Sequence, residues 1–276
     1  MPVTRHRPYP TDLCEAEWAA LEPLLPPPAR LGRPLKWPRR LMAEAIFYLV
    51  RSGCAWRLLP RHFPPWPTVY SQFRRWRRDD TLRRLHDRLR VLAREAEGRD
   101  AEPSAAMIDS QTVRATGVGG PARGYDPAKR TAGRKRHLLV DASGLILLAH
   151  GHAADLHDRR LGAQALVAAA EPRGLPRLEL IWGDGAYAGT FARWLAAERG
   201  WRVEVPKHRD RQLWRYGLEE KPKGFQVIPR RWVIERTFAW LSRSRRLARD
   251  YERLPETSVA MIHAAMSRIM LRRLAG

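Results

Sequence analysis

The chain has 276 residues, and 44% of them are apolar, which is enough for one large folded core or two ordinary ones. It carries 51 Lys and Arg against 29 Asp and Glu, a formal net charge of +22 that is spread along the whole length. Such a charge favours a polyanionic partner, because phosphates that are neutralised on binding release counterions. Charge therefore indicates a nucleic-acid partner, and it does not by itself indicate an activity.

The two cysteines, Cys14 and Cys54, are too few for a metal framework and fit a reducing compartment. We expect both to be buried apolar residues. No run of the sequence approaches the roughly 18 apolar residues that cross a bilayer, and the N-terminal residues lack the apolar core of a signal peptide. The sequence excludes a membrane protein and predicts a cytoplasmic, nucleoid-associated one.

The first hundred residues predict a compact all-helical domain, residues 1–100, that resembles a helix-turn-helix variant. The first helix is expected from Asp12, as its cap, to Leu25, where three prolines end it. The other three helices are expected at Leu41 to Arg51, from about Thr68 onward, and at Thr81 to Glu97.

The third of these helices interleaves arginines with aromatic residues. Such a helix suits DNA, where the arginines would contact phosphates. The alternative is a solvated basic face beside an ordinary apolar stripe. The predicted DNA contacts on this helix are Arg74, Arg75, Arg77 and Arg78.

After a polar boundary near Glu95 to Ser104, short apolar runs alternate with helical patterns, which predicts an α/β or α+β sheet domain over residues 101–276. The expected strands are Ala105 to Ile108, a hairpin of His137 to Val140 and Leu145 to His150, Leu178 to Trp182, and Trp201 to Val205. The expected helices are Arg160 to Glu171, Thr190 to Glu198 and Pro255 to Leu274.

A long segment from Thr116 to Arg136 is rich in glycine and basic residues, and we expect it to be an irregular loop. It formally contains a dinucleotide-binding pattern, but its glycines do not open a helix, so we reject that interpretation. A flexible basic loop more plausibly grips a phosphate backbone. Its predicted DNA contacts are Arg134, Lys135 and Arg136.

Two aspartates stand at the ends of predicted strands. Asp109 follows the apolar run Ala105 to Ile108, where a charge is costly without a partner or a metal. Asp184 follows Leu178 to Trp182 and lies between two glycines that leave room for a ligand. Each could also be a turn former or a cap. Carboxylates of this kind hold Mg²⁺, and paired ions assist phosphodiester chemistry.

A third carboxylate, Glu235, lies in the basic segment Lys221 to Arg249, which predicts an amphipathic helix. One turn ahead of it are Phe238 and Ala239, so no forward salt bridge explains it. Arg231, one turn back, leaves a structural ion pair open as an alternative. From the helix alone, a functional and a structural Glu235 are equally supported.

Several long motifs in these regions carry a resemblance to a known family. They are PRRWVIERTFAWLSRSRRLARDYERLPETSVAMI, AAMIDSQTVRA, GRKRHLLVDASG, LIWGDGAYAG and SGCAWRLLPRHFPPWPTVYSQFRRW. The chain resembles the bacterial DDE transposases of the insertion-sequence-5 group over nearly its whole length. The resemblance implies a ribonuclease-H-like catalytic core.

The resemblance also implies that Asp109, Asp184 and Glu235 form a catalytic, metal-binding triad for Mg²⁺ or Mn²⁺, with two ions. The implied reaction cuts the ends of a mobile element in double-stranded DNA and joins the freed 3′-hydroxyl to target DNA. We expect a homo-oligomer on that DNA. At the family's Tyr and Lys positions around the glutamate this chain has Ile228 and Ser242. The arginines expected to hold DNA there are Arg231, Arg236, Arg243, Arg245 and Arg246.

Two rival interpretations remain. The first is a zinc hydrolase, whose candidate ligands are His150, His152, Asp155, His157 and Asp158. The spacing is unfavourable for zinc, and a sheet-edge turn, in which Asp158 could support a neighbouring site without binding zinc, is favoured instead. The second is a catalytically silent protein derived from a transposase, which would bind DNA as a repressor.

Overall fold

A computed structural model describes the chain at residues 9–27, 36–117, 120, 122–156, 162–168, 170, 174–205 and 232–276. The chain divides into two compact units. The helical unit comprises Met1–Ala101, Val113–Arg123 and Trp240–Gly276, and the sheet unit comprises Glu102–Thr112 and Gly124–Ala239. In the parts of the chain that are described, no helix has the length and apolar character needed to span a bilayer.

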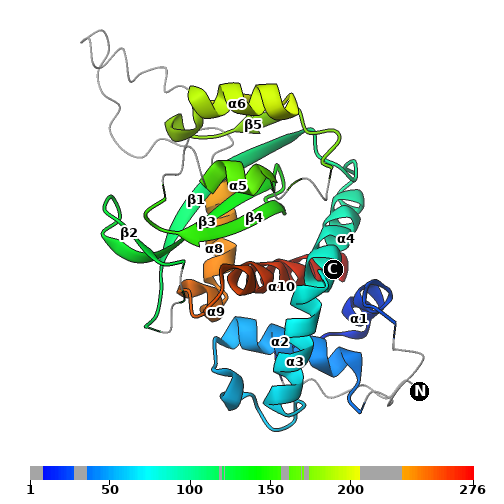
Figure 1. Cartoon of the computed structure of the whole chain (residues 1–276). Coiled ribbons are helices and arrows are strands. Elements are labelled where there is room, and N and C mark those ends of the chain that lie inside the picture. Colours follow the sequence, from blue (N-terminus) through cyan, green and yellow to red (C-terminus); the bar gives the residue numbers. More distant parts are fainter. Residues whose placement is uncertain are drawn as a thin grey trace, which may run out of the picture. The chain divides into compact units, whose positions relative to one another are not determined.

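The helical unit contains the four helices expected near the N-terminus, together with the C-terminal helices (Figure 1). Its elements are α1 (Glu15–Leu21), η1 (Glu22–Leu24), α2 (Arg39–Ser52), η2 (Trp56–Leu58), α3 (Trp66–Arg78), α4 (Thr81–Ala96), α9 (Arg245–Ala248) and α10 (Pro255–Leu274). Within the helical unit, α10 packs against α4, α2 and α1. Met261 and Met266 of α10 are fully buried.

The first helix begins later than expected, and its cap is a cysteine. The Cys14 sulfur accepts the backbone N–H of Glu17 at 3.4 Å, and the Glu17 carboxylate accepts the N–H of Cys14 at 2.8 Å. This is a reciprocal capping box. The prediction that Asp12 caps the helix was wrong, because its carboxylate instead accepts the N–H of Tyr9. Cys14 and Cys54 are both half-buried rather than buried.

A glycine turn after α2 brings α9 close. Gly53 has φ of +72°, and a Cβ at this position would meet the Cβ of Arg245 at 2.8 Å. Both the left-handed backbone and the close approach require glycine. The Arg246 guanidinium donates to the Cys54 carbonyl at 3.2 Å and pairs with Glu252 at 2.7 Å. The short helix α9 is therefore held on the end of α2.

The sheet unit is a six-stranded mixed sheet in the order β2-β3-β1-β5-β6, with β4 paired to β3. The pairs β3–β4 and β2–β3 are antiparallel, and β1–β5 and β5–β6 are parallel. The elements are β1 (Ala105–Arg114), β2 (Gly124–Asp126), β3 (Thr131–Asp141), β4 (Ile146–Ala153), α5 (Ala163–Ala168), β5 (Leu180–Trp182), η4 (Gly185–Tyr187), α6 (Thr190–Arg199), β6 (Arg202–Glu204) and α8 (Trp232–Ser242), whose last residues belong to the helical unit. The α/β fold class and the hairpin are confirmed.

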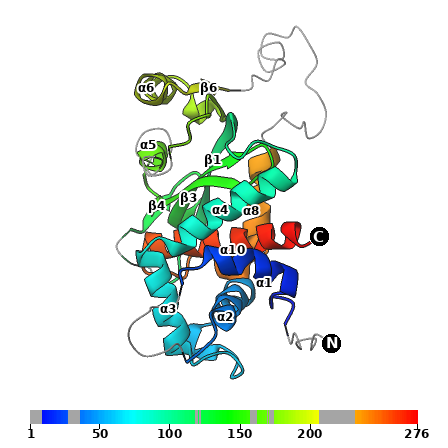
Figure 2. The ribbon, with the colours of Figure 1, turned by 90° about the vertical axis from the view of Figure 1, so that its right-hand side faces the viewer.

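Helices cover both faces of this sheet, as Figure 2 shows. On one face α5, η4 and α6 enclose a buried core that includes Ile108, Leu139 and Ile181. On the other face lies α8, which is fixed to the β3–β4 turn by two hydrogen bonds. The Thr237 hydroxyl donates to the Gly144 carbonyl at 2.8 Å, and Arg236 donates to the Ser143 carbonyl at 3.0 Å.

Three expectations about secondary structure were wrong. The segment from Thr116 to Arg136 is not wholly irregular, because it contains β2 and the first half of β3. Strand β1 continues past its expected end at Ile108 to Arg114, so Asp109 lies within the strand. The helix around Glu235 stops at Ser242, and a separate helix, α9, begins at Arg245. Residues 221–231 of the expected helix lie outside the described residues.

Candidate active site

The register of β1 against β5 brings two of the predicted carboxylates together. The strands are parallel, and Ala105, Ala106 and Met107 pair with Leu180, Ile181 and Trp182 in turn. Asp109 follows Met107 by two residues, and Asp184 follows Trp182 by two residues. Both aspartates line one small hollow, whose other lining residues are Met107, Ile108, Trp182, Gly183 and Ile234. Space beside them is tight, because a Cβ on Gly183 would meet the Ile108 side chain at 3.0 Å.

Strand alternation places Asp109 on the face of the sheet that α8 covers. Ile108 belongs to the core on the opposite face, so its neighbours Met107 and Asp109 point the other way. From α8, Ile234 is 1% exposed and reaches the hollow. Glu235 is the next residue, and it is exposed. The helix that carries the third predicted carboxylate is thus packed beside the two aspartates.

Backbone hydrogen bonds orient both aspartates. Oδ1 of Asp109 accepts the N–H of Ser110 at 2.7 Å, and Oδ1 of Asp184 accepts the N–H of Ala186 at 2.8 Å. Asp184 thereby caps η4. Two oriented carboxylates form a hard oxygen donor set of the kind that Mg²⁺ and Mn²⁺ take. Across the described ranges, however, no group of three or more His, Cys, Asp or Glu is close enough to hold a metal, so Glu235 does not complete the set here.

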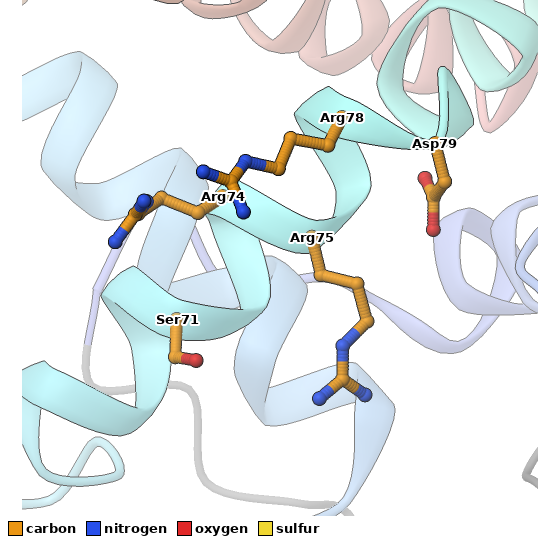
Figure 3. Close-up of a pocket in the computed structure, with 5 residues that line it drawn as sticks. All are labelled: Ser71, Arg74, Arg75, Arg78 and Asp79. Carbon is orange, nitrogen blue, oxygen red and sulfur yellow. The ribbon is translucent and has the colours of Figure 1, made fainter.

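The predicted DNA-contacting arginines fall into two environments. On α3, Arg74, Arg75 and Arg78 are exposed, and they surround a surface pocket with Ser71 and Asp79 (Figure 3). Arg77 on the same helix is half-buried. Arg74, Arg75 and Arg78 are therefore accessible to solvent, and their contact with DNA stays a prediction.

The basic run in β3 is buried instead. Arg134, Lys135 and Arg136 are 1%, 8% and 2% exposed. Lys135 donates to the Leu156 carbonyl at 3.2 Å and lies 3.8 Å from the Asp126 carboxylate. By alternation from Leu139, Arg134 and Arg136 lie on the sheet face that carries Asp109. At these positions the segment is a strand with buried side chains and not the expected flexible loop. Their contact with phosphates stays a prediction.

The arginines near Glu235 also divide. Arg243 and Arg245 are exposed, whereas Arg246 is buried in its ion pair with Glu252. Arg236 is half-buried, and its guanidinium lies 4.5 Å from the centre of the Trp232 ring. Arg231 and Ile228 lie outside the described residues.

His152, one of the candidate zinc ligands, forms a buried pair with His137. Nδ1 of His152 lies 2.8 Å from the Ala153 carbonyl, and Nε2 of His152 lies 2.8 Å from Nδ1 of His137. Burial, with the nearby His152, His150 and Lys135, lowers the pKa of His137 to about 3. Residues 157 and 158 lie outside the described residues, and no metal-holding group of three is found in the rest.

Sequence reasoning missed His137, because only the pairing of β3 with β4 sets it opposite the histidines of the neighbouring strand. It also missed the hydrogen bonds of Thr237 and Arg236 that attach α8 to the β3–β4 turn. The predicted hairpin of these two strands was the available signal for His137. No sequence signal marked the hydrogen bonds of Thr237 and Arg236.

Comparison with known proteins identifies the family. Residues 100–270 match the model described as "Transposase DDE domain", and residues 13–86 match one described as "Putative transposase of IS4/5 family". Among curated proteins, the "Insertion element IS402 uncharacterized 16.2 kDa protein" of Burkholderia cepacia is 33% identical over 37% of this chain and 72% of its own length. The "Putative transposase for insertion sequence element IS402" of the same species is 30% identical over 49% of this chain and 62% of its own length.

A third relative, the "Uncharacterized protein y4sN" of Sinorhizobium fredii, is 33% identical over 37% of this chain and 76% of its own length. No solved structure gives a significant match. The mixed sheet, with antiparallel β2–β3 and β3–β4 pairs and parallel β1–β5 and β5–β6 pairs, agrees with the ribonuclease-H-like core that the DDE domain implies. The match to the DDE model covers more than half of the chain. This chain therefore belongs to the DDE transposases of the IS4/IS5 family.

Proposed function

We propose that this protein cuts the ends of a mobile element in double-stranded DNA and joins them to a target, with Asp109, Asp184 and Glu235 as its catalytic carboxylates. The observation that carries the proposal is the β1–β5 register, which sets Asp109 and Asp184 on one hollow. The family match and the net charge of +22 support DNA as the substrate.

The two aspartates would hold Mg²⁺ or Mn²⁺ as a pair of oxygen donors, and Glu235 would join them from α8. When bound, two such ions activate an attacking oxygen and stabilise the leaving oxygen of an in-line displacement. Glu235 is exposed next to the buried Ile234, so its side chain can take another rotamer without loss of the packing at Ile234. The reaction requires no nucleophilic side chain from the protein.

The chain's own basic residues would bind and position the DNA. The exposed arginines on α3 and the exposed pair Arg243 and Arg245 are available for phosphates. We propose that the protein acts as an oligomer on DNA, because each element has two ends to be cut and joined. The rival proposal, a repressor without catalysis, shares every basic contact and differs only in needing no carboxylates.

A cleavage assay tests the proposal. Purified protein with Mg²⁺ or Mn²⁺ should nick a duplex that bears the ends of its own element. Asp109→Asn, Asp184→Asn and Glu235→Gln should each abolish cleavage and leave duplex binding largely intact. Asp155→Asn is the matched control, because Asp155 is an exposed aspartate of the same unit that does not line the hollow.

The outcomes separate the rivals. Undiminished cleavage by one of the three variants removes that residue from the site. Binding of the element ends without cleavage by the unmodified protein supports the repressor. Loss of cleavage in Asp155→Asn or His152→Ala, with Asp109→Asn active, would support the zinc hydrolase instead.

A further inference from the structure

The helical unit contains a cavity that the proposed chemistry does not use. It has a volume of about 390 Å³ and lies among α2, α10 and the residues around the end of α8. All of its lining residues belong to the helical unit. Its size falls in the range of small-ligand pockets, roughly 300–1,000 Å³, and is far too small for a duplex.

The floor of this cavity is apolar and partly aromatic. Phe47 and Val50 from α2 and Ala265 from α10 are buried, and Ile269 and Trp240 are half-buried. The Trp240 ring lies under the guanidinium of Arg273, at 4.7 Å from ring centre to Cζ. A bare inorganic anion does not suit a floor of this kind. Binding there is favourable only for a ligand that buries apolar or aromatic surface against the floor.

The rim of the cavity is cationic. Five of its fourteen lining residues, all from described parts of the chain, are arginines, and none is acidic: Arg51, Arg243, Arg268, Arg272 and Arg273. Acidic residues outside the lining neutralise two of them, since Arg268 pairs with Glu17 and Arg273 lies 3.4 Å from Glu97.

Within the described parts of the chain, the other three arginines have no acidic partner, so their charge is available there. Arg272 donates to the Pro10 carbonyl at 2.9 Å, and Arg51 donates to the Arg243 carbonyl at 2.5 Å. A carbonyl partner holds a guanidinium in place without cancelling its charge. Arg's five donors also leave others for a ligand. Arg243 is exposed at the same rim. The rim is therefore pre-organised for an anion.

We propose that this cavity binds one nucleotide of single-stranded DNA, with the base on the apolar floor beside Trp240 and its phosphates on Arg51, Arg243 and Arg272. An aromatic group that carries phosphate satisfies both parts of the cavity, and stacking on aromatic and guanidinium planes binds bases with little sequence preference. The inference rests on the proposed function in taking DNA as the source of the nucleotide. It adds a single-strand anchor in the helical unit, apart from the carboxylates.

The test is fluorescence anisotropy of a fluorescein-labelled deoxyadenylate trinucleotide with the full-length protein in EDTA. Without metal ions the carboxylate site contributes little. Ile269→Trp fills the floor from a half-buried position, and Arg272→Ala removes one rim cation. We expect each to weaken binding about fivefold or more, as loss of one stacked base or phosphate contact does. The matched control Arg88→Ala, an exposed arginine of α4 outside the lining, should change binding less than about twofold.

A trinucleotide with three abasic sites tests the base itself, since it keeps the phosphates and loses the aromatic rings. It should bind unmodified protein about fivefold or more weakly than the normal trinucleotide. Equal binding of the two, or normal binding by both cavity variants, overturns the inference. Binding of an acidic aromatic peptide to the cavity, without binding of the trinucleotide, also overturns the inference. If circular dichroism shows that Arg272→Ala is unfolded, Ile269→Trp decides.

The two proposals fail separately. A protein that binds the trinucleotide through the cavity but cuts no element end with Mg²⁺ retains the cavity and loses the proposed function. A protein that cuts DNA while both cavity variants bind the trinucleotide normally retains the function and loses the cavity.

Discussion

Two basic runs of this chain have similar sequences and opposite environments. On α3, Arg74, Arg75 and Arg78 are exposed around a surface pocket, whereas Arg134 and Arg136 in β3 are nearly fully buried. The difference follows from the element that holds them. A helix at the surface of its unit can present one face to solvent, and a strand with a neighbour on each side and a helix over its face cannot. A basic run therefore indicates DNA contact only after its element is known.

The largest expected effect concerns the buried run. Arg136→Ala should lower the free energy of unfolding by about 3–5 kcal/mol, because it removes a large side chain that is 2% exposed and leaves a cavity. The measurement is chemical denaturation, with Arg75→Ala as the exposed counterpart on α3. A similar, small effect of both substitutions would mean that the two environments do not differ as described.

Arg246 extends the comparison to α9, where buried and exposed arginines alternate. Arg246→Ala should cost about 3 kcal/mol of stability, since it leaves the buried Glu252 without the guanidinium that now lies 2.7 Å away. Its exposed neighbour on α9 supplies the control, and Arg245→Ala should change stability by less than about 0.5 kcal/mol. In a double-mutant cycle, Glu252→Gln should relieve most of the cost of Arg246→Ala. Strict additivity would exclude the ion pair as the cause.

The buried His137, on the same strand as Arg136, makes stability depend on pH. The pKa of His137 is lowered to about 3, so at pH 3–6.5 the unfolded chain binds a proton there and the folded chain does not. His137 should therefore have no effect above about pH 6.5 and should lower stability as pH falls, by up to about 1.4 kcal/mol per pH unit.

The comparison of His137→Phe with unmodified protein at pH 7 and pH 5 measures this contribution. The loss of stability between the two values should be smaller in the variant, by about 2 kcal/mol at most. His62→Phe, which changes an exposed histidine, is the control. An equal loss in His137→Phe and unmodified protein would show that His137 is protonated in the folded chain.

The smallest effect on stability is expected on α3. Arg74→Ala, Arg75→Ala and Arg78→Ala should each change the free energy of unfolding by less than about 0.5 kcal/mol. Their effect should appear in DNA binding, where each neutralised phosphate contributes about 0.9 to the slope of log affinity against log salt. A slope that stays unchanged in the triple variant would remove α3 from the DNA-binding surface.

The sequence predicted most of the sheet unit, because its signals are local. Apolar runs marked β1, the β3–β4 hairpin and β5, and the position of Asp184 directly after a strand was visible as well. The pairing of β1 with β5, which sets Asp109 near Asp184, followed only from the family resemblance. Local pattern gives strands, and their order depends on contacts between residues far apart in the chain.

Other features could not be predicted, for physical reasons that particular residues show. The basic character of Arg134 and Arg136 suggested solvent, and only their place in an enclosed strand explains their burial. Cys14 was expected in a core, but it lies three residues before Glu17 and forms the N-terminal cap of α1 with it. The packing of α10 against α4 and α2 is a tertiary contact. Helical periodicity shows which face of a helix is apolar, and it does not show which other helix that face contacts.

The central claim is that Asp109 and Asp184 hold divalent ions, and the most direct measurement is Mn²⁺ binding, followed by electron paramagnetic resonance of free Mn²⁺. Unmodified protein should take up Mn²⁺, Asp109→Asn and Asp184→Asn should each lose most of this uptake, and Asp155→Asn should bind as unmodified protein does. Glu235→Gln should show a partial loss, since the third carboxylate joins the set from α8. Full Mn²⁺ uptake by both aspartate variants would contradict the assignment.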